Sequence, residues 1–167
     1  MRWSLALLVW LTAGLAHADP PSRFTFRSYG SEHGLSNLSI NVIEQSDDGL
    51  LWVGTEDGLF GFDGAHFRRM DPDDSLPSTW IFSLLADDGG MWVGTARGLR
   101  WIARDRVDLG RALGAPEAQV NSLAAGPDHR IWAATDAGLV VGRAGAFAAV
   151  KGWPGGRSEE RRVGKEC

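Results

Sequence analysis

The chain has 167 residues, with 21 acidic and 17 basic side chains, a formal net charge of −4 and a single cysteine, Cys167. An acidic chain without a cluster of Lys or Arg is not typical of proteins that bind nucleic acid or anionic membranes. One cysteine excludes a disulfide framework within the chain and cysteine-based metal sites.

Residues 1–18 have the pattern of a secretory signal peptide. Arg2 precedes an apolar run over residues 5–16, and Ala16-His17-Ala18 forms a small-x-small cleavage site. The apolar run is too short to span a bilayer comfortably. We expect cleavage after Ala18 and a periplasmic location; the alternative, a buried N-terminal helix, is not required by the repeats that follow.

Residues 19–33 form a short lead-in to those repeats. Apolar and polar side chains alternate from Phe24 to Tyr29, which is typical of a half-buried β-strand. We expect this strand to pair with a sheet outside the chain.

A repeat of 40 residues organises the rest of the chain. Its clearest part, Trp52-Val53-Gly54-Thr55, returns at Trp92 and again at Trp132, with a threonine three residues later each time. A fixed period of this length is the sequence sign of a repeat array. Upstream positions also fall in this register, namely Ile43, Ser83 and Leu123, followed by Asp48, Asp88 and Asp128.

Each repeat is expected to form four antiparallel strands joined by Asp-Gly and Gly-containing turns. The predicted strands are 40–45, 51–55, 59–62 and 65–70; then 81–86, 91–95, 99–103 and a weak one near Val107; then 120–125, 131–135, 139–142 and 146–150. Equally spaced four-stranded sheets without helices predict an all-β fold, a partial β-propeller of about three blades. The blades are assigned to residues 34–75, 76–115 and 116–156. Independent tandem hairpins are the alternative, but they would bury too little to be stable.

The recurring residues of the repeat have structural interpretations. A tryptophan in the middle of a strand fills the gap between adjacent sheets, a threonine at the strand end bonds a neighbouring backbone group, and a glycine supplies positive φ in the next turn. These residues are Trp52, Trp92, Trp132, Thr55, Thr95, Thr135, Gly58, Gly98 and Gly138.

At this point the motifs resemble a known family. Gly34-Leu35-Ser36, the segment from Asp47 to Thr55, and Asp57-Gly58-Leu59 are similar to the two-component regulator propeller repeat. The third repeat departs from it, with Ala133-Ala134 in place of Val-Gly and His129 in place of Gly.

The resemblance implies a sensor. Members of the family are exported or periplasmic propellers followed by a membrane helix and an output domain, usually a histidine kinase and sometimes a diguanylate cyclase. The chain is then an N-terminal fragment of a membrane-anchored signalling protein and not itself an enzyme. The implied partners are a small molecule or oligosaccharide as signal, the remaining blades of the parent chain, and a second receptor molecule in a homodimer. The alternative is a fragment of an exported propeller enzyme that acts on carbohydrate.

Alternation of chain direction places the turns at residues 46–50 and 63–64 on one rim of the blades. The loops at 56–58, 96–98 and 136–137 lie on the other rim, and their sequences vary between repeats. Variable loops on a repeated scaffold are common binding positions. We expect Glu56, Asp57, Arg97 and Asp136 to face a ligand; ordinary solvated loop charges are the alternative.

No catalytic residue, cofactor or metal ligand stands out. The turns at residues 46–49 and 86–89 lack the alternating acidic spacing of calcium loops, and His33, His66 and His129 are dispersed.

Two further expectations concern the C-terminal residues and the stability of the three blades alone. Residues 157–167 are aperiodic and resemble the translation of a sequencing adapter, so we exclude them from the fold. A closed propeller needs about four to eight blades. Residues 19–156 alone are therefore expected to be poorly soluble or unfolded.

Overall fold

The computed structural model describes residues 25–71, 75–103, 106–108, 114–143 and 145–152. The predicted signal peptide, residues 1–18, and the predicted artefactual tail, residues 157–167, lie outside the described residues. Within these ranges, no helix combines the length and the apolar character needed to cross a membrane.

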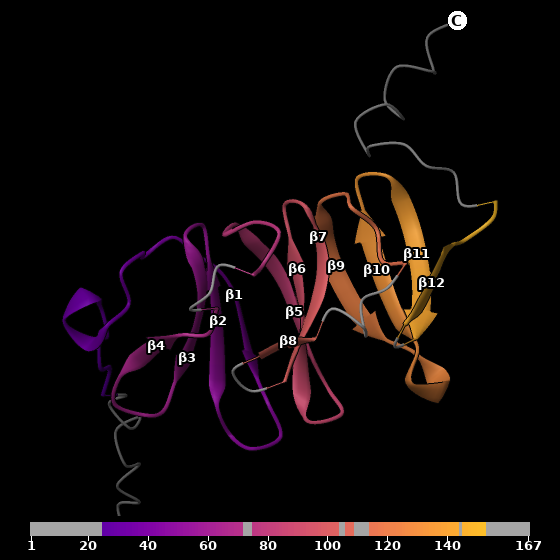
Figure 1. The fold of residues 1–167 in the computed structure, drawn as a ribbon. Coiled ribbons are helices and arrows are strands. Elements are labelled where there is room, and N and C mark those ends of the chain that lie inside the picture. Colours follow the sequence, from indigo (N-terminus) through magenta and orange to yellow (C-terminus); the bar gives the residue numbers. More distant parts are fainter. Residues whose placement is uncertain (1–24, 72–74, 104–105, 109–113, 144, 153–167) are drawn as a thin grey trace, which may run out of the picture.

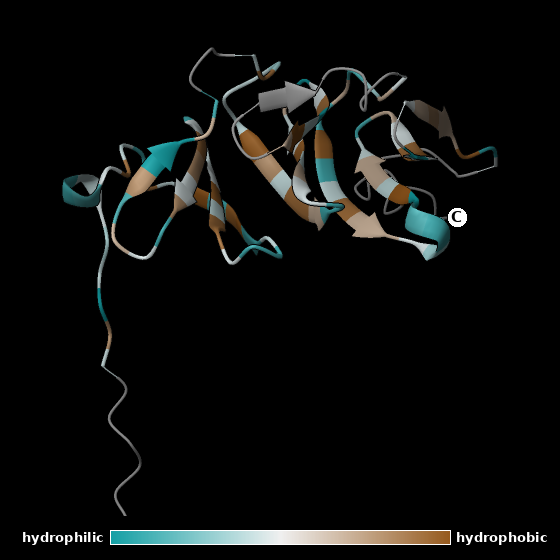
Figure 2. Cartoon of the chain, turned by 60° about the horizontal axis from the view of Figure 1, so that its bottom comes forward, coloured by the Kyte–Doolittle hydropathy of each residue, from teal (hydrophilic) through white to brown (hydrophobic). Residues whose placement is uncertain are grey.

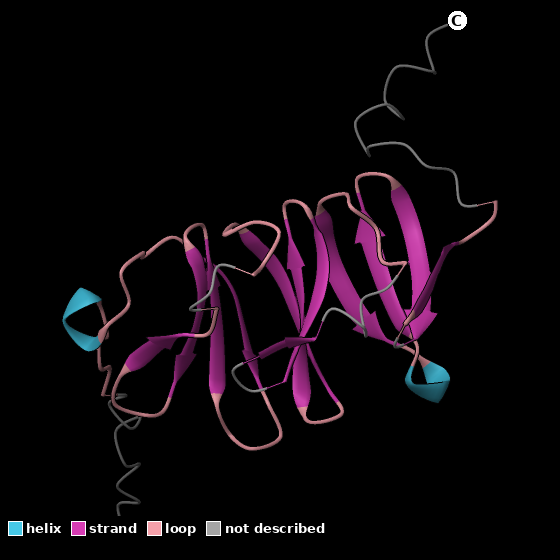
Figure 3. Cartoon of the chain, viewed as in Figure 1, coloured by secondary structure: helices cyan, strands magenta, loops and turns pink. Residues whose placement is uncertain are grey.

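All strands of the described residues belong to three four-stranded antiparallel sheets (Figures 1 and 3). The first contains β1 (Ile40–Gln45), β2 (Leu51–Thr55), β3 (Gly58–Phe62) and β4 (Phe67–Arg69). The second contains β5 (Ile81–Asp87), β6 (Gly90–Thr95), β7 (Gly98–Ala103) and β8 (Arg106–Asp108). The third contains β9 (Val120–Ala125), β10 (Ile131–Thr135), β11 (Gly138–Arg143) and β12 (Ala146–Ala149). The predicted all-β fold of three repeated sheets is confirmed.

The sheets stand side by side in chain order, like blades (Figure 1). Within each sheet the strands are hydrogen-bonded in sequence order. The first strands of successive sheets contact one another, β1 with β5 and β5 with β9. These three first strands therefore form the inner side of the row, and we call them the inner strands.

Hydrophobic side chains fill the space between successive sheets. Figure 2 colours many residues of the strands as hydrophobic and those of the two short 3-10 helices, η1 (Ser31–His33) and η2 (Pro127–His129), as hydrophilic. The first core joins Trp52, Leu59 and Met70 of the first sheet to Ile81, Leu84, Met91, Val93 and Ile102 of the second.

The second core repeats this arrangement one sheet further on. Trp92, Leu99 and Trp101 of the second sheet pack against Val120, Ile131 and Ala133 of the third. Trp52 and Trp92 are only 2% and 1% exposed, whereas Trp132 is half-buried. The difference follows from position, because no described sheet lies beyond the third.

The lead-in strand predicted near residues 24–29 stays a prediction, because the sheet expected to pair with it is not among the described sheets. Residues 25–30 belong to no strand, and Phe26 is 91% exposed.

The predicted register of the inner strands is wrong at one position. Ile43 lies opposite Val53, and its counterparts opposite Val93 and Ala133 are Leu84 and Leu123, so Ser83 is not the equivalent of Ile43. Ser83 instead corresponds to Val42. The inner strand of the second sheet is displaced by one residue relative to the 40-residue period, a shift that a strict period cannot show.

Candidate functional site

Three equivalent loops lie on one rim of the sheets, between β2 and β3, β6 and β7, and β10 and β11; we call this the β2–β3 rim. In the first loop, Thr55 Oγ1 accepts a hydrogen bond from the Asp57 backbone N–H and donates one to the Gly58 carbonyl, both at 3.0 Å. The glycine has φ of 137°, a conformation that side chains with a Cβ rarely adopt.

The other two loops copy this geometry. Thr95 Oγ1 donates to the Gly98 carbonyl at 2.9 Å, and Thr135 Oγ1 donates to the Gly138 carbonyl at 2.7 Å. The glycines have φ of 130° and 123°. The two residues between the threonine and the glycine of each loop therefore point outward, and the hydrogen bonds of the threonine restrict the backbone of the turn.

The four predicted ligand-facing residues occupy these outward positions. Glu56, Asp57, Arg97 and Asp136 are all exposed, and they come from three different sheets. Asp136 Oδ1 accepts a hydrogen bond from Asn121 Nδ2 at 2.9 Å. Across the described ranges, no hydrogen bond or ion pair joins the four side chains to one another. The structure places them on one rim without assembling them into a single pocket.

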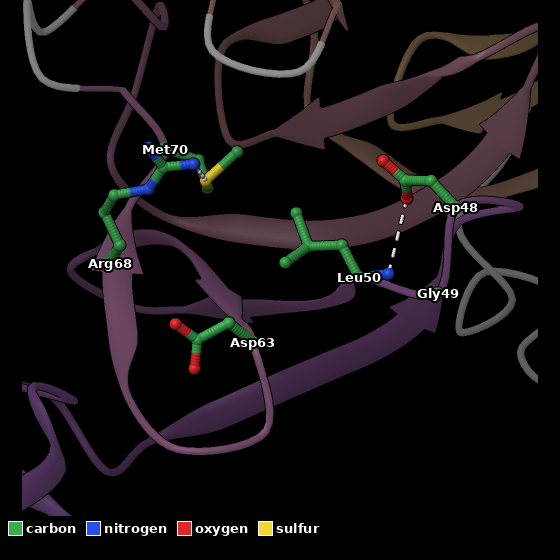
Figure 4. Close-up of a pocket in the computed structure, with 6 residues that line it drawn as sticks. All are labelled: Asp48, Gly49, Leu50, Asp63, Arg68 and Met70. Carbon is green, nitrogen blue, oxygen red and sulfur yellow. Dashed lines mark hydrogen bonds between the residues drawn. The ribbon is translucent and has the colours of Figure 1, made fainter.

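The opposite rim, which carries the β1–β2, β3–β4 and β5–β6 turns, is hollowed at two places; we call it the β1–β2 rim. The larger hollow has a volume of about 440 Å³. Figure 4 shows its lining: Asp48, Gly49, Leu50, Asp63, Arg68 and Met70. Arg68 Nη2 approaches the Met70 sulfur at 3.9 Å, and Asp48 Oδ1 accepts the Leu50 backbone N–H at 3.3 Å.

The smaller hollow, of about 270 Å³, lies between the β1–β2 and β5–β6 turns. Its lining is Ser46, Asp47, Asp48, Trp52, Gly89 and Gly90. Asp48 therefore borders both hollows. The sequence does not predict these hollows, because its acidic residues here have the pattern of turn formers.

Two aspartates that line the larger hollow, Asp48 and Asp63, accept hydrogen bonds within their own turns. Asp63 Oδ1 accepts hydrogen bonds from the backbone N–H groups of His66 at 2.8 Å and Ala65 at 2.9 Å. These two bonds, the His66 bond most strongly, hold the pKa of the Asp63 carboxyl below its ordinary value of 3.8. Among the described side chains, no group of three or more His, Cys, Asp or Glu could hold a metal ion.

Repeated four-stranded sheets, stacked through a tryptophan core and connected by equivalent loops, define a β-propeller segment. Residues 34–57 and 75–97 match the family described as two component regulator propeller. The first two sheets therefore each contain a match to the two-component regulator propeller repeat.

Known proteins with related sequence or structure agree with this family. A stretch of 56 residues is 50% identical to Histidine kinase P4 of Formosa agariphila. The fold is similar to the extracellular domain of a hybrid two component system from B. thetaiotaomicron, with a TM-score of 0.65 and 22% identity over 74% of this chain. It is also similar to the extracellular domain of a one component system from the same organism, with a TM-score of 0.61 and 24% identity over 74% of this chain.

The chain spans only a small part of each of these proteins. The matched stretch is 32% of this chain but 4% of the histidine kinase, and the chain covers 20% and 18% of the two solved structures. At this level of identity, the two structures establish the propeller fold of the chain.

Proposed function

We propose that the chain is the extracytoplasmic sensing segment of a membrane-anchored signalling protein whose output domain is a histidine kinase or a diguanylate cyclase. The observation that carries the proposal is the match of residues 34–57 and 75–97 to the two component regulator propeller. The 50% identity of a 56-residue stretch to a histidine kinase supports it. The signal-peptide pattern of residues 1–18 supports a periplasmic location.

The geometry supports a sensing role through the β2–β3 rim. Its three loops have the same threonine-anchored backbone but different outward residues, Glu56-Asp57, Ala96-Arg97 and Asp136-Ala137. A fixed scaffold with varied loop residues is suited to recognition. In this proposal the signal is a small molecule or an oligosaccharide that spans several loops, the remaining blades of the parent chain complete the surface, and the receptor works as a homodimer.

The test is signal-dependent output from the full-length parent protein in membrane vesicles. We expect autophosphorylation, or cyclic dinucleotide synthesis for a cyclase, to respond to one member of an oligosaccharide panel. R97E should weaken that response, because Arg97 is exposed on the β2–β3 rim. D47N on the opposite rim is the matched control and should leave it unchanged. A parent protein with neither a membrane span nor an output domain would refute the proposal.

A further inference from the structure

The contact between successive sheets contains a polar bond as well as an apolar core. Asn41 Nδ2 of the first sheet donates a hydrogen bond to the Ile81 carbonyl of the second at 2.9 Å. Ser83 Oγ of the second sheet donates to the Val120 carbonyl of the third at 3.1 Å. Ile81 and Val120 are equivalent, because each begins an inner strand and lies opposite the threonine of its own sheet.

This bond has a structural cause. Each inner strand carries a bulge immediately after its first residue, between Ile40 and Val42 and between Ile81 and Ser83. A bulge interrupts the hydrogen-bond ladder, so a neighbouring backbone carbonyl needs a partner from elsewhere. The preceding sheet supplies that partner from its own bulge region.

The third sheet has the same donors. Asn121 occupies the place of Asn41, and Ser122, which lies opposite Ala134, occupies the place of Ser83, which lies opposite Gly94. Both side chains are exposed. Asn121 Nδ2 gives a hydrogen bond to Asp136, but an amide nitrogen carries two N–H groups. The third sheet can therefore make the same bond to a further sheet.

The first sheet shows what such a partner surface looks like. Ile40 and Ile43 are 45% and 52% exposed, whereas their counterparts Ile81 and Leu84 are buried by the preceding sheet. The face that carries these residues is the leading face of a sheet, and the face that carries the tryptophan is its trailing face. In both contacts of the chain, a trailing face covers a leading face.

The residue before the threonine in the second strand of each sheet limits the size of the side chain that begins the next inner strand. A Cβ at Gly54 would lie 2.6 Å from Ile81 Cγ2, and a Cβ at Gly94 would lie 2.8 Å from Val120 Cγ1. The third sheet has Ala134 at this position. Its methyl group leaves no room for isoleucine or valine at the start of the next inner strand.

We propose that the trailing face of the third sheet, formed by Trp132, Asn121, Ser122 and Ala134, docks the leading face of a further repeat of the same polypeptide. Asn121 or Ser122 donates to the first carbonyl of that repeat's inner strand, and the residue there is smaller than valine. Two contacts of the same kind within the chain support this, and it rests on the proposed place of the chain in a larger propeller.

The test extends residues 1–150 with a sheet of known sequence. A second copy of residues 75–115 is joined after Val150, with I81A in the added copy only. Hydroxyl-radical footprinting then measures the oxidation rate of each tryptophan. We expect Trp132 to become as protected as Trp52 and Trp92 in the same molecule. With isoleucine retained in the added copy, protection should be lost, and A134G should restore it.

Two variants test the polar bond within the extended chain. N121A combined with S122A should raise the oxidation rate of Trp132 about fivefold, the effect expected for one lost hydrogen bond. D136A is the matched control and should leave it unchanged, because both donors remain.

Three results would overturn the proposal. The first is a Trp132 that stays reactive while Trp52 and Trp92 are protected. The second is protection of Trp132 in the extended chain that disappears on dilution while Trp52 and Trp92 stay protected, which assigns the face to a second molecule and not to the added sheet. The third is loss of protection at all tryptophans in two different extended chains. One is the chain described above, and the other carries a second copy of residues 116–150, with V120A in the added copy only. None of these measurements needs a signal, a membrane or an output domain, so they can fail while the receptor role stands.

Discussion

Gly54 in β2 lies directly against Ile81 at the start of β5, where a Cβ on the glycine would come within 2.6 Å of Ile81 Cγ2 and 2.7 Å of Val42 Cγ1. G54A should therefore force the first two sheets apart and lower the free energy of unfolding by about 1 to 3 kcal/mol. Urea-dependent proteolysis of the chain, fused to a soluble carrier, measures the change. The exposed equivalent Ala134 provides the control: A134G should change stability little, and equal effects at the two positions would contradict the assignment.

Truncation of the repeat tryptophans should have unequal effects. Trp92 is 1% exposed, and its ring packs edge-on against Phe147 at 5.4 Å, so W92A should cost about 3 to 5 kcal/mol. Trp132 is half-buried, so W132A should lower the free energy of unfolding clearly less than W92A does. The same proteolysis assay compares them. Similar losses for W92A and W132A would mean that a further sheet already covers Trp132.

The threonine-anchored loop predicts a contrast between two substitutions of Thr95. Thr95 is fully buried, accepts a hydrogen bond from the Arg97 backbone N–H and donates one to the Gly98 carbonyl. T95V removes both bonds and should cost about 1 to 3 kcal/mol, whereas T95S keeps the hydroxyl group and should cost less. If serine and valine were equally destabilising, shape and not hydrogen bonding would be the role of Thr95.

The β3–β4 turn should respond to acid through Asp63. Backbone hydrogen bonds from His66 and Ala65 lower the pKa of its carboxyl below 3.8. A carboxyl with a lowered pKa stabilises the folded state above its unfolded pKa, and this contribution disappears as the pH falls through the folded value. An NMR titration should place the midpoint of Asp63 below 3.8, and D63N should abolish that transition. A midpoint at or above 3.8 would refute the assignment.

The isolated residues 19–156 should associate or precipitate. Ile40 and Ile43 on the leading face are 45% and 52% exposed, and Trp132 on the trailing face is only half-buried. Exposed apolar sheet faces favour aggregation. Size-exclusion chromatography with light scattering tests this expectation. A monomer with one sharp, cooperative melting transition would contradict it.

The strands were predictable because two local signals agree. A 40-residue period locates the repeats, and Asp-Gly turns such as Asp63-Gly64 locate their ends. The four strands 40–45, 51–55, 120–125 and 131–135 were predicted with the bounds that the structure has. The family was predictable for the same reason, since its motif includes these turns and the Trp-x-Gly-Thr strand.

Features that depend on contacts between sheets could not be predicted. The one-residue shift that replaces Ser83 by Leu84 as the counterpart of Ile43 requires the observed pairing of β5 with β6. The bond from Asn41 to the Ile81 carbonyl joins residues 40 positions apart through a bulge. The hollows beside Asp48 depend on how neighbouring turns are placed.

The most direct test of the central claim, that this chain is part of a sensor propeller, is long-read sequencing of the parent locus across the codon for Gly156. We predict that the reading frame continues into further Trp-x-Gly-Thr repeats, then a membrane span and a kinase or cyclase domain. A frame that ends at Cys167, with neither further repeats nor a membrane span, would contradict the account.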